Sequence, residues 1–515
     1  MHRLFTLCFI IITVMLAGCS RHTAKTVNYY FDPVAGDDSL NAGTSQEKPF
    51  RSLSMINKLT LKPGDSVLLK SGAVFTEPMF INCSGDSGKP VVFGKYGGNE
   101  KPRIRLDGTV NQAVHAYNSE HIVIRDLEVS NIGPEPVSRL TGVLVELKHY
   151  GTAQDITLDN LFVHDVLGSA ATDSTGGGVG IQIRNYIDGV EDSVLSRFDG
   201  LLIQNCLVKD CVRDGILMWG NWIRSKWFPS LNVVIRNNTL DGIPGHGIVL
   251  VGCLKPLVEY NVMKNCPDIM PHDAGSDGIW PWGCDSALIQ FNIVSDVSAH
   301  QDGFGFDSDY NCKGSSLQYN LSYNNAGGFL LICNPGGWPP DWCIGNSGTV
   351  IRYNVSINDG IRTQKVDVHN QQYFSPVINV TGPTENTLIE KNLFFVMKKE
   401  DRNTDRTLVH FTDWHGYSDS TLFRNNYIYS EESNTAWKPT KSTNSKAESN
   451  IYSGILAGDL NGFSQENEQS GSKLWYDRSD KNWDILLNFL KDKTIVLNGE
   501  NKHVWDILGI EDQTN

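Results

Sequence analysis

The sequence predicts an all-β fold, a single-stranded, right-handed parallel β-helix of roughly nine to eleven coils. Short strands ending in Asn, or once in Asp, recur with a variable period of roughly 23 to 45 residues, as in Ile235-Arg236-Asn237-Asn238 and Leu317-Gln318-Tyr319-Asn320. Each repeat also holds a Gly followed by alternating apolar residues, as in Gly247-Ile248. From about residue 80 until near the C-terminus no long helical periodicity interrupts this pattern.

Short strands explain why such coils must stack. A strand of four or five residues cannot bury its apolar face alone, so each coil needs the coil below it. Asn at a tight bend tolerates the left-handed backbone region, and stacked Asn side chains can bond to one another along the column. Gly supplies the other corner. The right-handed sense follows from the general preference of parallel crossover connections.

The N-terminus has the pattern of an export signal. Arg3 precedes the apolar run Leu4–Leu16, which is too short to span a bilayer. Leu16-Ala17-Gly18-Cys19 resembles the bacterial lipoprotein box, which implies cleavage before Cys19 and lipidation of its thiol. An ordinary secretory signal with an incidental Cys is the alternative. We expect a lipoprotein signal peptide over residues 1–18, a tether over 19–31, and a lipid anchor in the bacterial cell envelope, in the outer membrane facing the periplasm or the surface.

Two further regions follow from the pattern. Residues 32–430 are expected to form the β-helix domain with its N-terminal cap, and residues 431–515 a C-terminal capping segment. A short amphipathic helix is expected over Ser52–Leu59, followed by a strand over Ser66–Lys70. Trp483–Leu490 has helical spacing of apolar residues, and we expect it to pack over the last coil, because an open stack would expose strand edges.

The net charge limits the classes of partner that the chain can bind, and the cysteine pattern predicts whether metal sites or disulfides form. The formal charge is −14, and Lys and Arg are scattered, which argues against nucleic acid; we expect a monomer. No C-x-x-C metal spacing occurs. Several cysteines fall at equivalent repeat positions, so we expect buried free thiols rather than disulfides for the set beyond Cys8 and Cys19, which is Cys83, Cys206, Cys211, Cys253, Cys266, Cys284, Cys312, Cys333 and Cys343.

A family resemblance rests on three features. These are the Gly36-Asp37-Asp38 opening that runs through Phe50, the turn Pro63-Gly64-Asp65-Ser66-Val67, and the Asn-ended coils. Together they resemble the pectate-lyase-like parallel β-helix superfamily, and within it the secreted carbohydrate-active lipoproteins of Bacteroidota. The resemblance covers about residues 28 to 430. It implies the fold and a carbohydrate substrate but no single reaction, because the superfamily contains lyases, hydrolases, esterases, epimerases and adhesins.

One stretch, Pro271–Asp309, contains two similar copies of a short sequence motif that is rich in reactive residues. They are Asp277-Gly278-Ile279-Trp280-Pro281-Trp282 and Asp302-Gly303-Phe304-Gly305-Phe306-Asp307. Alignment on the Gly places Asp277 and Asp302 in neighbouring coils, which lie ~4.8 Å apart. Two carboxylates within roughly 5 Å suit the nucleophile and acid/base pair of a retaining glycosidase, or a shared Ca²⁺.

We therefore predict catalytic roles for five residues. Asp302 and Asp307 would share the acid and the nucleophile or base roles, and Asp277, His300 and His272 would tune or position them. Asp307 is the best single candidate, because it replaces an apolar or aromatic residue in a column that faces outward. The alternatives are structural: an Asp before Gly also caps a bend, and both histidines stand in loops where surface histidines are common.

Substrate contacts are predicted at four tryptophans and one carboxylate. Trp280 and Trp282 alternate on one strand face, with Trp219 one or two coils away, and exposed indoles beside carboxylates form platforms for sugar rings. Trp338 would form the wall of the same cleft, and Asp309 would bind substrate. The alternative is that a loop such as Asn221–Ser230 covers the tryptophans as ordinary core.

The function predicted from these residues is hydrolysis of glycosidic bonds in a polysaccharide or oligosaccharide. One alternative is a polysaccharide lyase acting by β-elimination on a uronate-containing polymer, for which Arg213, Arg224, Lys226 and Lys313 are available. The other alternative is a non-catalytic glycan-binding β-helix. No cofactor is certain, although the carboxylates would suit Ca²⁺. Gly245-His246-Gly247 matches a short polygalacturonase motif, but the partner carboxylates of that motif are absent.

Overall fold

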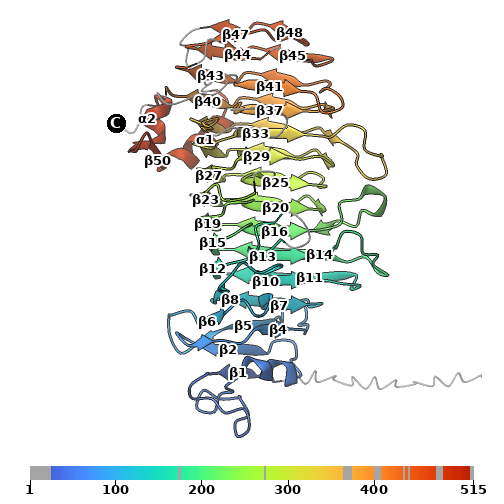
Figure 1. Cartoon of the computed structure of the whole chain (residues 1–515), viewed down its shortest axis with the longest axis vertical. Coiled ribbons are helices and arrows are strands. Elements are labelled where there is room, and N and C mark those ends of the chain that lie inside the picture. Colours follow the sequence, from blue (N-terminus) through green and yellow to red (C-terminus); the bar gives the residue numbers. More distant parts are fainter. Residues whose placement is uncertain are drawn as a thin grey trace, which may run out of the picture.

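The computed structural model describes residues 25–171, 176–271, 274–363, 374–398, 408–432, 435–438, 441–470 and 479–510. The chain winds into a parallel β-helix that rises from β1 (Asn28–Phe31) to β47 (Leu456–Gly458) and β48 (Phe463–Glu466) (Figure 1). Three long sheets of 13, 14 and 17 strands form its faces, and every strand pairing within them is parallel. The predicted fold class is confirmed.

The strands of each sheet follow one another up the stack. The 13-stranded sheet contains β4 Met79–Ile81, β7 Gln112–Tyr117, β10 Thr141–Glu146, β13 Val179–Arg184, β16 Ile216–Trp219, β20 Ile248–Val251, β25 Ile279–Trp282, β29 Phe304–Ser308, β33 Gly328–Cys333, β37 Ile378–Thr381, β41 Val409–Thr412, β44 Thr435–Trp437 and β47. The 14-stranded sheet contains β3 Val74–Phe75, β6 Arg103–Leu106, β9 Glu128–Asn131, β12 Phe162–Val166, β15 Leu207–Cys211, β19 Thr239–Asp241, β23 Val262–Lys264, β27 Ile293–Ser295, β32 Leu321–Tyr323, β36 Val355–Ile357, β40 Leu393–Val396, β43 Tyr427–Ser430, β46 Ile451–Ser453 and β49 Gln469–Ser470.

The 17-stranded sheet contains β1, β2 Ser66–Lys70, β5 Val91–Tyr96, β8 Ile122–Arg125, β11 Thr152–Asp159, β14 Arg197–Gln204, β17 Ser230–Leu231, β18 Val234–Arg236, β21 Cys253–Leu254, β22 Leu257–Glu259, β26 Leu288–Gln290, β31 Ser316–Gln318, β35 Val350–Arg352, β39 Leu388–Glu390, β42 Leu422–Arg424, β45 Ser445–Glu448 and β48. A face of 13 strands, one for each coil, exceeds the nine to eleven coils expected. The expected number was low because the first coils lack the Asn and Gly landmarks and because residues beyond 430 were expected to form a cap rather than coils.

An asparagine ladder holds one corner of the stack. The Asn292 N–H and Nδ2 both donate to Asn320 Oδ1, at 2.9 and 3.1 Å, and each member repeats this bond to the next coil. The predicted stacking of Asn side chains is thus confirmed. In the ladder the left-handed backbone belongs to the residue before each Asn, such as Phe291 (φ 56°), whereas the strand-end residues Asn160 and Asn205 of earlier coils have it themselves, as predicted (φ 53° and 56°). The ladder comprises the buried residues Asn238, Asn261, Asn292, Asn320, Asn354, Asn392, Asn426 and Asn450.

The N-terminal elements match the expectation closely. The capping helix is present as the 3₁₀ helix η1 (Leu53–Lys58), which buries Leu53 and Ile56 against the first coils. The predicted strand is β2, with the predicted bounds. Strand β1 pairs with β2, so the expected tether over residues 19–31 runs into the first strand of the β-helix. Residues 1–24, including the predicted signal peptide and Cys19, lie outside the described residues.

The C-terminal region differs from the expectation. Coils continue beyond residue 430 through β44, β45, β46, β47, β48 and β49. The cap is formed by α1 (Asn482–Leu490), the hairpin β50 (Thr494–Leu497) and β51 (Glu500–His503), and α2 (Val504–Leu508). Trp483, Leu486 and Leu490 pack against Tyr353 and other residues of the middle coils, so α1 covers the side of the stack rather than its end (Figure 1).

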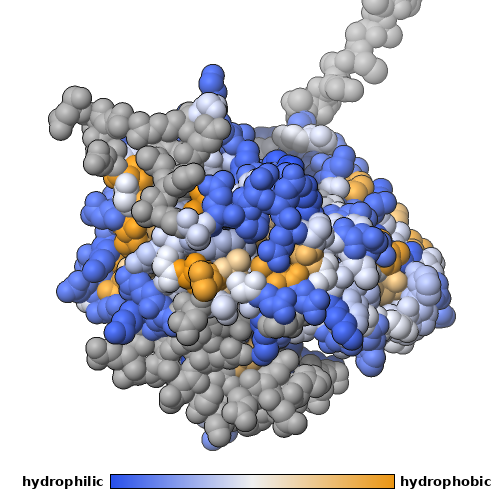
Figure 2. Space-filling model, turned by 90° about the horizontal axis from the view of Figure 1, so that it is seen from above, coloured by the Kyte–Doolittle hydropathy of each residue, from blue (hydrophilic) through white to orange (hydrophobic). Residues whose placement is uncertain are grey.

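The remaining features concern the core and the surface. All nine cysteines of the described chain are free, and eight of them are buried, which confirms the prediction of buried thiols. Within the described part of the chain no helix has the length and apolar character needed to cross a membrane. Seen from the end that carries β47, the described surface is mainly hydrophilic, and hydrophobic residues form small groups (Figure 2).

Candidate active site

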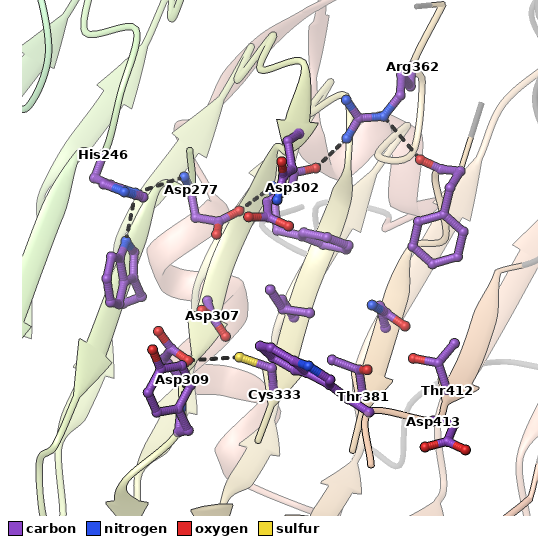
Figure 3. A pocket seen from close by; sticks show the side chains of 18 residues that line it. His246, Asp277, Asp302, Asp307, Asp309, Cys333, Arg362, Thr381, Thr412 and Asp413 are labelled. Carbon is purple, nitrogen blue, oxygen red and sulfur yellow. Dashed lines mark hydrogen bonds between the residues drawn. The ribbon is translucent and has the colours of Figure 1, made fainter. Parts of the chain in front are cut away.

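A cavity of about 490 Å³ opens on the outer side of the 13-stranded sheet (Figure 3). Five of its lining residues are aspartates, Asp277, Asp302, Asp307, Asp309 and Asp413. Its other walls are His246, Trp280, Gln301, Phe304, Tyr310, Leu331, Cys333, Arg362, Phe374, Asn379, Thr381, Thr412 and Trp414. The volume lies within the ~300–1,000 Å³ typical of sites for small ligands.

The strand register decides which side chains face the cavity. Ser276 pairs with Asp302, whereas Ile279 pairs with Phe306, so the second coil holds one extra residue between these pairs. Phe306 therefore takes the core position next to Ile279, and Phe304 turns to line the cavity. The alignment of Gly278 with Gly303 matches Phe304 with the core residue Ile279, and it was wrong at this point, because this coil carries a bulge that a Gly alignment cannot show.

Asp277 stands in a column of turn-capping side chains. Asp214 Oδ1 accepts the His246 N–H (3.1 Å), and His246 Nδ1 accepts the Asp277 N–H (3.2 Å). Asp277 Oδ1 in turn accepts the Phe304 N–H at 2.8 Å. Trp280 Nε1 also donates to His246 Nδ1 (3.1 Å), so the ring carries no proton on that nitrogen, and burial lowers the His246 pKa. Asp277 thus caps a bend and lines the cavity at the same time.

Arg362 fixes the backbone that carries Asp302. Its Nη1 donates to the carbonyls of Ala299 and His300, at 2.6 and 2.5 Å, and its Nη2 donates to the carbonyl of Asp302. Its Nε donates to Phe374 O at 3.0 Å. The guanidinium N–H groups therefore donate to main-chain carbonyls. The half-buried Asp302 carboxyl faces the cavity (Figure 3).

Asp307, Asp309 and Cys333 form a second acidic group across the cavity (Figure 3). Cys333 Sγ donates to Asp309 Oδ1 at 2.8 Å, and the Tyr310 N–H donates to the same oxygen at 2.6 Å. Asp307 is only 2% exposed, and its Oδ1 is buried without a hydrogen-bond donor among the described residues. A buried unpaired carboxylate oxygen is costly, which favours the protonated form of Asp307.

The acidic residues raise one another's pKa values. Burial, followed by repulsion from Asp302, holds the Asp277 pKa well above its usual range. Burial and the charge of Asp309 do the same for Asp307. Burial raises the pKa of Asp309 to about 7, and it raises that of Asp302 against the opposing charge of Arg362. Closely placed carboxyls with displaced pKa values are the groups that acid/base chemistry requires.

Not every predicted residue reaches the cavity. His300 lies outside the lining, and its Nδ1 is 3.4 Å from Asp268 Oδ2. Trp219 and Trp282 also lie outside it and pack with Trp222, whose ring stacks on that of Trp282 at 5.0 Å. This cover is the alternative considered for the tryptophans. His272 lies outside the described residues.

Other lining residues were not singled out from the sequence. Asn379, Thr381, Thr412 and Trp414 enter through β37, β41 and the turn after β41, one and two coils beyond β33. Asn379 and Thr381 pair with Leu331 and Cys333, so a correct register from β29 upward would have predicted both. Arg362 follows the turn residue Asp359, and nothing in the repeat marks its role.

One group of residues offers ligands for a metal ion. Asp307, Asp309 and Cys333 each present one donor atom, and these atoms lie within 4.8 Å of one another. Ca²⁺ takes six to eight oxygen ligands, and a thiol does not belong to that set. The donor set of Asp307, Asp309 and Cys333 fits a softer divalent cation better than Ca²⁺.

The fold and the cavity together define a parallel β-helix with an acidic pocket on one face. No family model matches the chain. Among curated proteins, a lacto-N-biosidase of Bifidobacterium longum subsp. longum is 28% identical over 539 residues, an alignment that covers 85% of this chain and 32% of the relative. The chain thus spans about one third of the length of that protein.

Among solved structures, too, a lacto-N-biosidase is similar to this chain. The native crystal structure of a GH136 lacto-N-biosidase from Eubacterium ramulus matches with a TM-score of 0.58 and 27% identity, over 76% of this chain and 66% of that one. Its selenomethionine derivative matches with a TM-score of 0.59 and 24% identity, over 87% and 68%. A mannuronic acid-specific family 6 polysaccharide lyase from human gut microbiota reaches 0.54 at 12% identity, over 90% and 94%, which shows the shared fold alone.

Proposed function

We propose that this chain is a glycoside hydrolase that removes a short saccharide unit from the end of an oligosaccharide. The similar protein from Bifidobacterium is named a lacto-N-biosidase, and we take lacto-N-biosides as the first substrate class to test. A cavity of about 490 Å³ suits a terminal unit better than the middle of a long polymer, which would need an open groove.

The observation that carries this proposal is that two of the carboxyls in the cavity are accessible and two are almost fully buried. Asp302 and Asp309 are half-buried and line the cavity, whereas Asp277 and Asp307 are 4% and 2% exposed. A group that exchanges a proton or a bond with substrate must reach it, so we assign the acid and the nucleophile or base roles to Asp302 and Asp309. Asp277 and Asp307 then act through their charge and hydrogen bonds.

This assignment changes the pair expected from the sequence. There Asp307 was the best candidate, because the Gly alignment placed it in an open outward column. Its carboxyl does line the cavity, but the unpaired Oδ1 is buried. Asp309, expected only to bind substrate, has the more accessible carboxyl and a pKa of about 7, which keeps a proton available near neutral pH.

A lyase fits these residues less well. β-Elimination needs a base beside the sugar ring and a cation that neutralises the uronate carboxylate. Arg362 is the one Lys or Arg among the described lining residues, and its bonds to backbone carbonyls leave it little freedom for either role.

A purely binding protein also fits less well. Sugar recognition alone does not require carboxyls that repel one another and stay protonated toward neutral pH. Such an arrangement destabilises the fold, which is typical of a site kept for chemistry.

The test uses the purified chain from residue 20 onward with lacto-N-biosides, other terminal disaccharide glycosides and uronate polymers. We expect new reducing ends without the ultraviolet absorbance of unsaturated uronates. Growing absorbance would establish a lyase instead. Binding without product, across the whole panel, would leave the glycan-binding alternative.

We also propose that the chain is a lipoprotein of the bacterial cell envelope. The support is the sequence Leu16-Ala17-Gly18-Cys19 after a short apolar run. Expression of the full chain and of Cys19→Ala in a bacterial host, followed by membrane fractionation, tests it. We expect only the unaltered chain in detergent-soluble membrane fractions, and equal distribution of both would contradict the anchor.

A further inference from the structure

The exposed tryptophans of this chain gather at one place. Trp338, Trp342 and Trp414 are 38%, 47% and 39% exposed, and all other tryptophans within the described residues are buried or half-buried. We call these three residues the tryptophan shelf. Large exposed indoles are unusual on a soluble protein unless they meet a partner or a ligand.

The shelf continues the wall of the acidic cavity. Trp414 itself lines the cavity, and so does Tyr310, whose ring lies 6.4 Å from that of Trp414 and 5.2 Å from that of Trp338. Behind them the buried Trp222 ring lies 5.8 Å from Trp338 and 6.0 Å from Trp342. The aromatic surface therefore runs without a break from inside the cavity to the exposed loop.

The backbone under the shelf is held firmly. The N–H groups of Arg224 and Ser225 donate to the carbonyls of Trp342 and Asp341, at 3.2 and 2.7 Å. Asn311 Nδ2 donates to the same Trp342 carbonyl at 3.1 Å. The Gly336 N–H donates to Trp414 O at 2.9 Å, which ties the two parts of the shelf together. Such bonds fix the backbone that carries the indoles before any ligand arrives, and this lowers the entropy lost on binding.

We propose that the tryptophan shelf binds the saccharide on the leaving-group side of the bond that is cleaved, with the apolar face of a pyranose ring stacked on the indoles. This inference rests on the proposed hydrolase function, in which the released unit fills the cavity and the rest of the substrate extends past its mouth. An uncharged ring face suits this surface, because the indoles supply contact area without charge.

The test compares two substrates that share the released unit. One carries a saccharide as leaving group, and the other carries fluoride, which is too small to reach the shelf. We expect Trp338→Ala and Trp342→Ala each to lower kcat/KM for the saccharide substrate about tenfold, and to leave the value for the glycosyl fluoride within twofold. Trp342→Phe should recover most of the loss, because a ring remains.

Ile344→Ala is the matched control, since Ile344 is an exposed apolar residue of the same loop without an aromatic ring. We expect it to change neither value.

Equal losses on both substrates in the tryptophan variants, or no loss on either, would overturn the proposed role of the tryptophan shelf, while the hydrolase function would stand. If the unaltered chain cleaves neither substrate, the proposed function fails first. Binding of the uncleaved saccharide substrate, weakened by Trp342→Ala and not by Ile344→Ala, would then still support the shelf, and equal binding by both variants would overturn it.

Discussion

The asparagine ladder and the acidic cavity bury polar side chains in opposite ways. In the ladder each Oδ1 beyond that of Asn238 accepts two N–H groups and each Nδ2 donates to a carbonyl, as at Asn320. In the cavity Asp307 Oδ1, Gln301 Oε1 and Asn379 Oδ1 are buried without donors from the described residues. Satisfied polar groups fix a unique stack, whereas unsatisfied ones beside like charges reduce stability and mark the place where a ligand completes the bonding.

The largest effect is expected from removing the accessible carboxyls. Asp302→Asn and Asp309→Asn should each lower kcat about a hundred- to ten-thousand-fold, because each removes a proton donor or a nucleophile while keeping the shape. Steady-state hydrolysis of an activated aryl glycoside measures this. Asp214→Asn is the control, since Asp214, like Asp302, directly precedes a Gly but lies outside the cavity lining. If the control lost as much activity, these carboxylates would have only a structural role.

Breaking the asparagine ladder should lower the stability of the fold and leave the activity of the folded protein unchanged. Asn320→Ala removes the acceptor of the buried Asn292 N–H and the Nδ2 donor to the Ile289 carbonyl, so we expect a loss of about 2–4 kcal/mol in the free energy of unfolding. Denaturant unfolding measures it, and kcat of the remaining folded protein should stay within twofold. An unfolding free energy within 0.5 kcal/mol of the unaltered chain, a change of roughly the size of most surface substitutions, would show that the ladder bonds contribute little.

Removing a buried carboxyl from the cavity should instead increase the free energy of unfolding. Asp307→Asn removes an ionisable group that is buried beside other carboxyls, so we expect it to stabilise the fold by about 1–3 kcal/mol at pH 8. The gain should shrink toward pH 4, where the native carboxyl is protonated. Thermal unfolding at both pH values measures the difference, and a destabilised variant at pH 8 would contradict the account.

A smaller effect is expected in the pH dependence of stability. Asp309 has a folded pKa of about 7 against an ordinary value of 3.8, so the folded state keeps its proton to higher pH than the unfolded chain. Its stabilising contribution is complete below about pH 4 and is lost as the pH rises to about 7. The decline in melting temperature from pH 5 to pH 8 should therefore be shallower in Asp309→Asn. Parallel curves for both proteins would refute the shifted pKa.

The same comparison shows what sequence could predict. The ladder was predictable, because Asn at a strand end is a local signal that recurs in coil after coil. The cavity was predictable only as a region, because one extra residue before Phe306 shifts the register and pairs Ile279 with Phe306 rather than with Phe304. Arg362 was missed, because it acts on backbone carbonyls of a coil far from it in sequence.

The position of the C-terminal helix was missed for a related reason. The residues before the ladder asparagines include Tyr260, Phe291, Tyr319 and Tyr353, whose rings stack at 5.0 to 5.4 Å and form an apolar stripe along the stack. Trp483 of α1 packs on this stripe. These aromatic residues were predicted only as parts of the short strands that end in Asn, so the side of the stack was not considered as a docking face for α1.

The measurement that tests the central claim most directly is azide rescue of Asp302→Ala, Asp309→Ala and Asp307→Ala with an activated aryl glycoside. A small anion can enter the space left by a carboxylate that contacts the substrate, and it attacks the sugar to give a glycosyl azide. The account predicts rescue at Asp302 or Asp309, with the anomer of the azide telling the nucleophile from the acid, and no rescue at Asp307. Rescue at Asp307 alone would contradict the assignment of Asp302 and Asp309 as the pair that reaches the substrate.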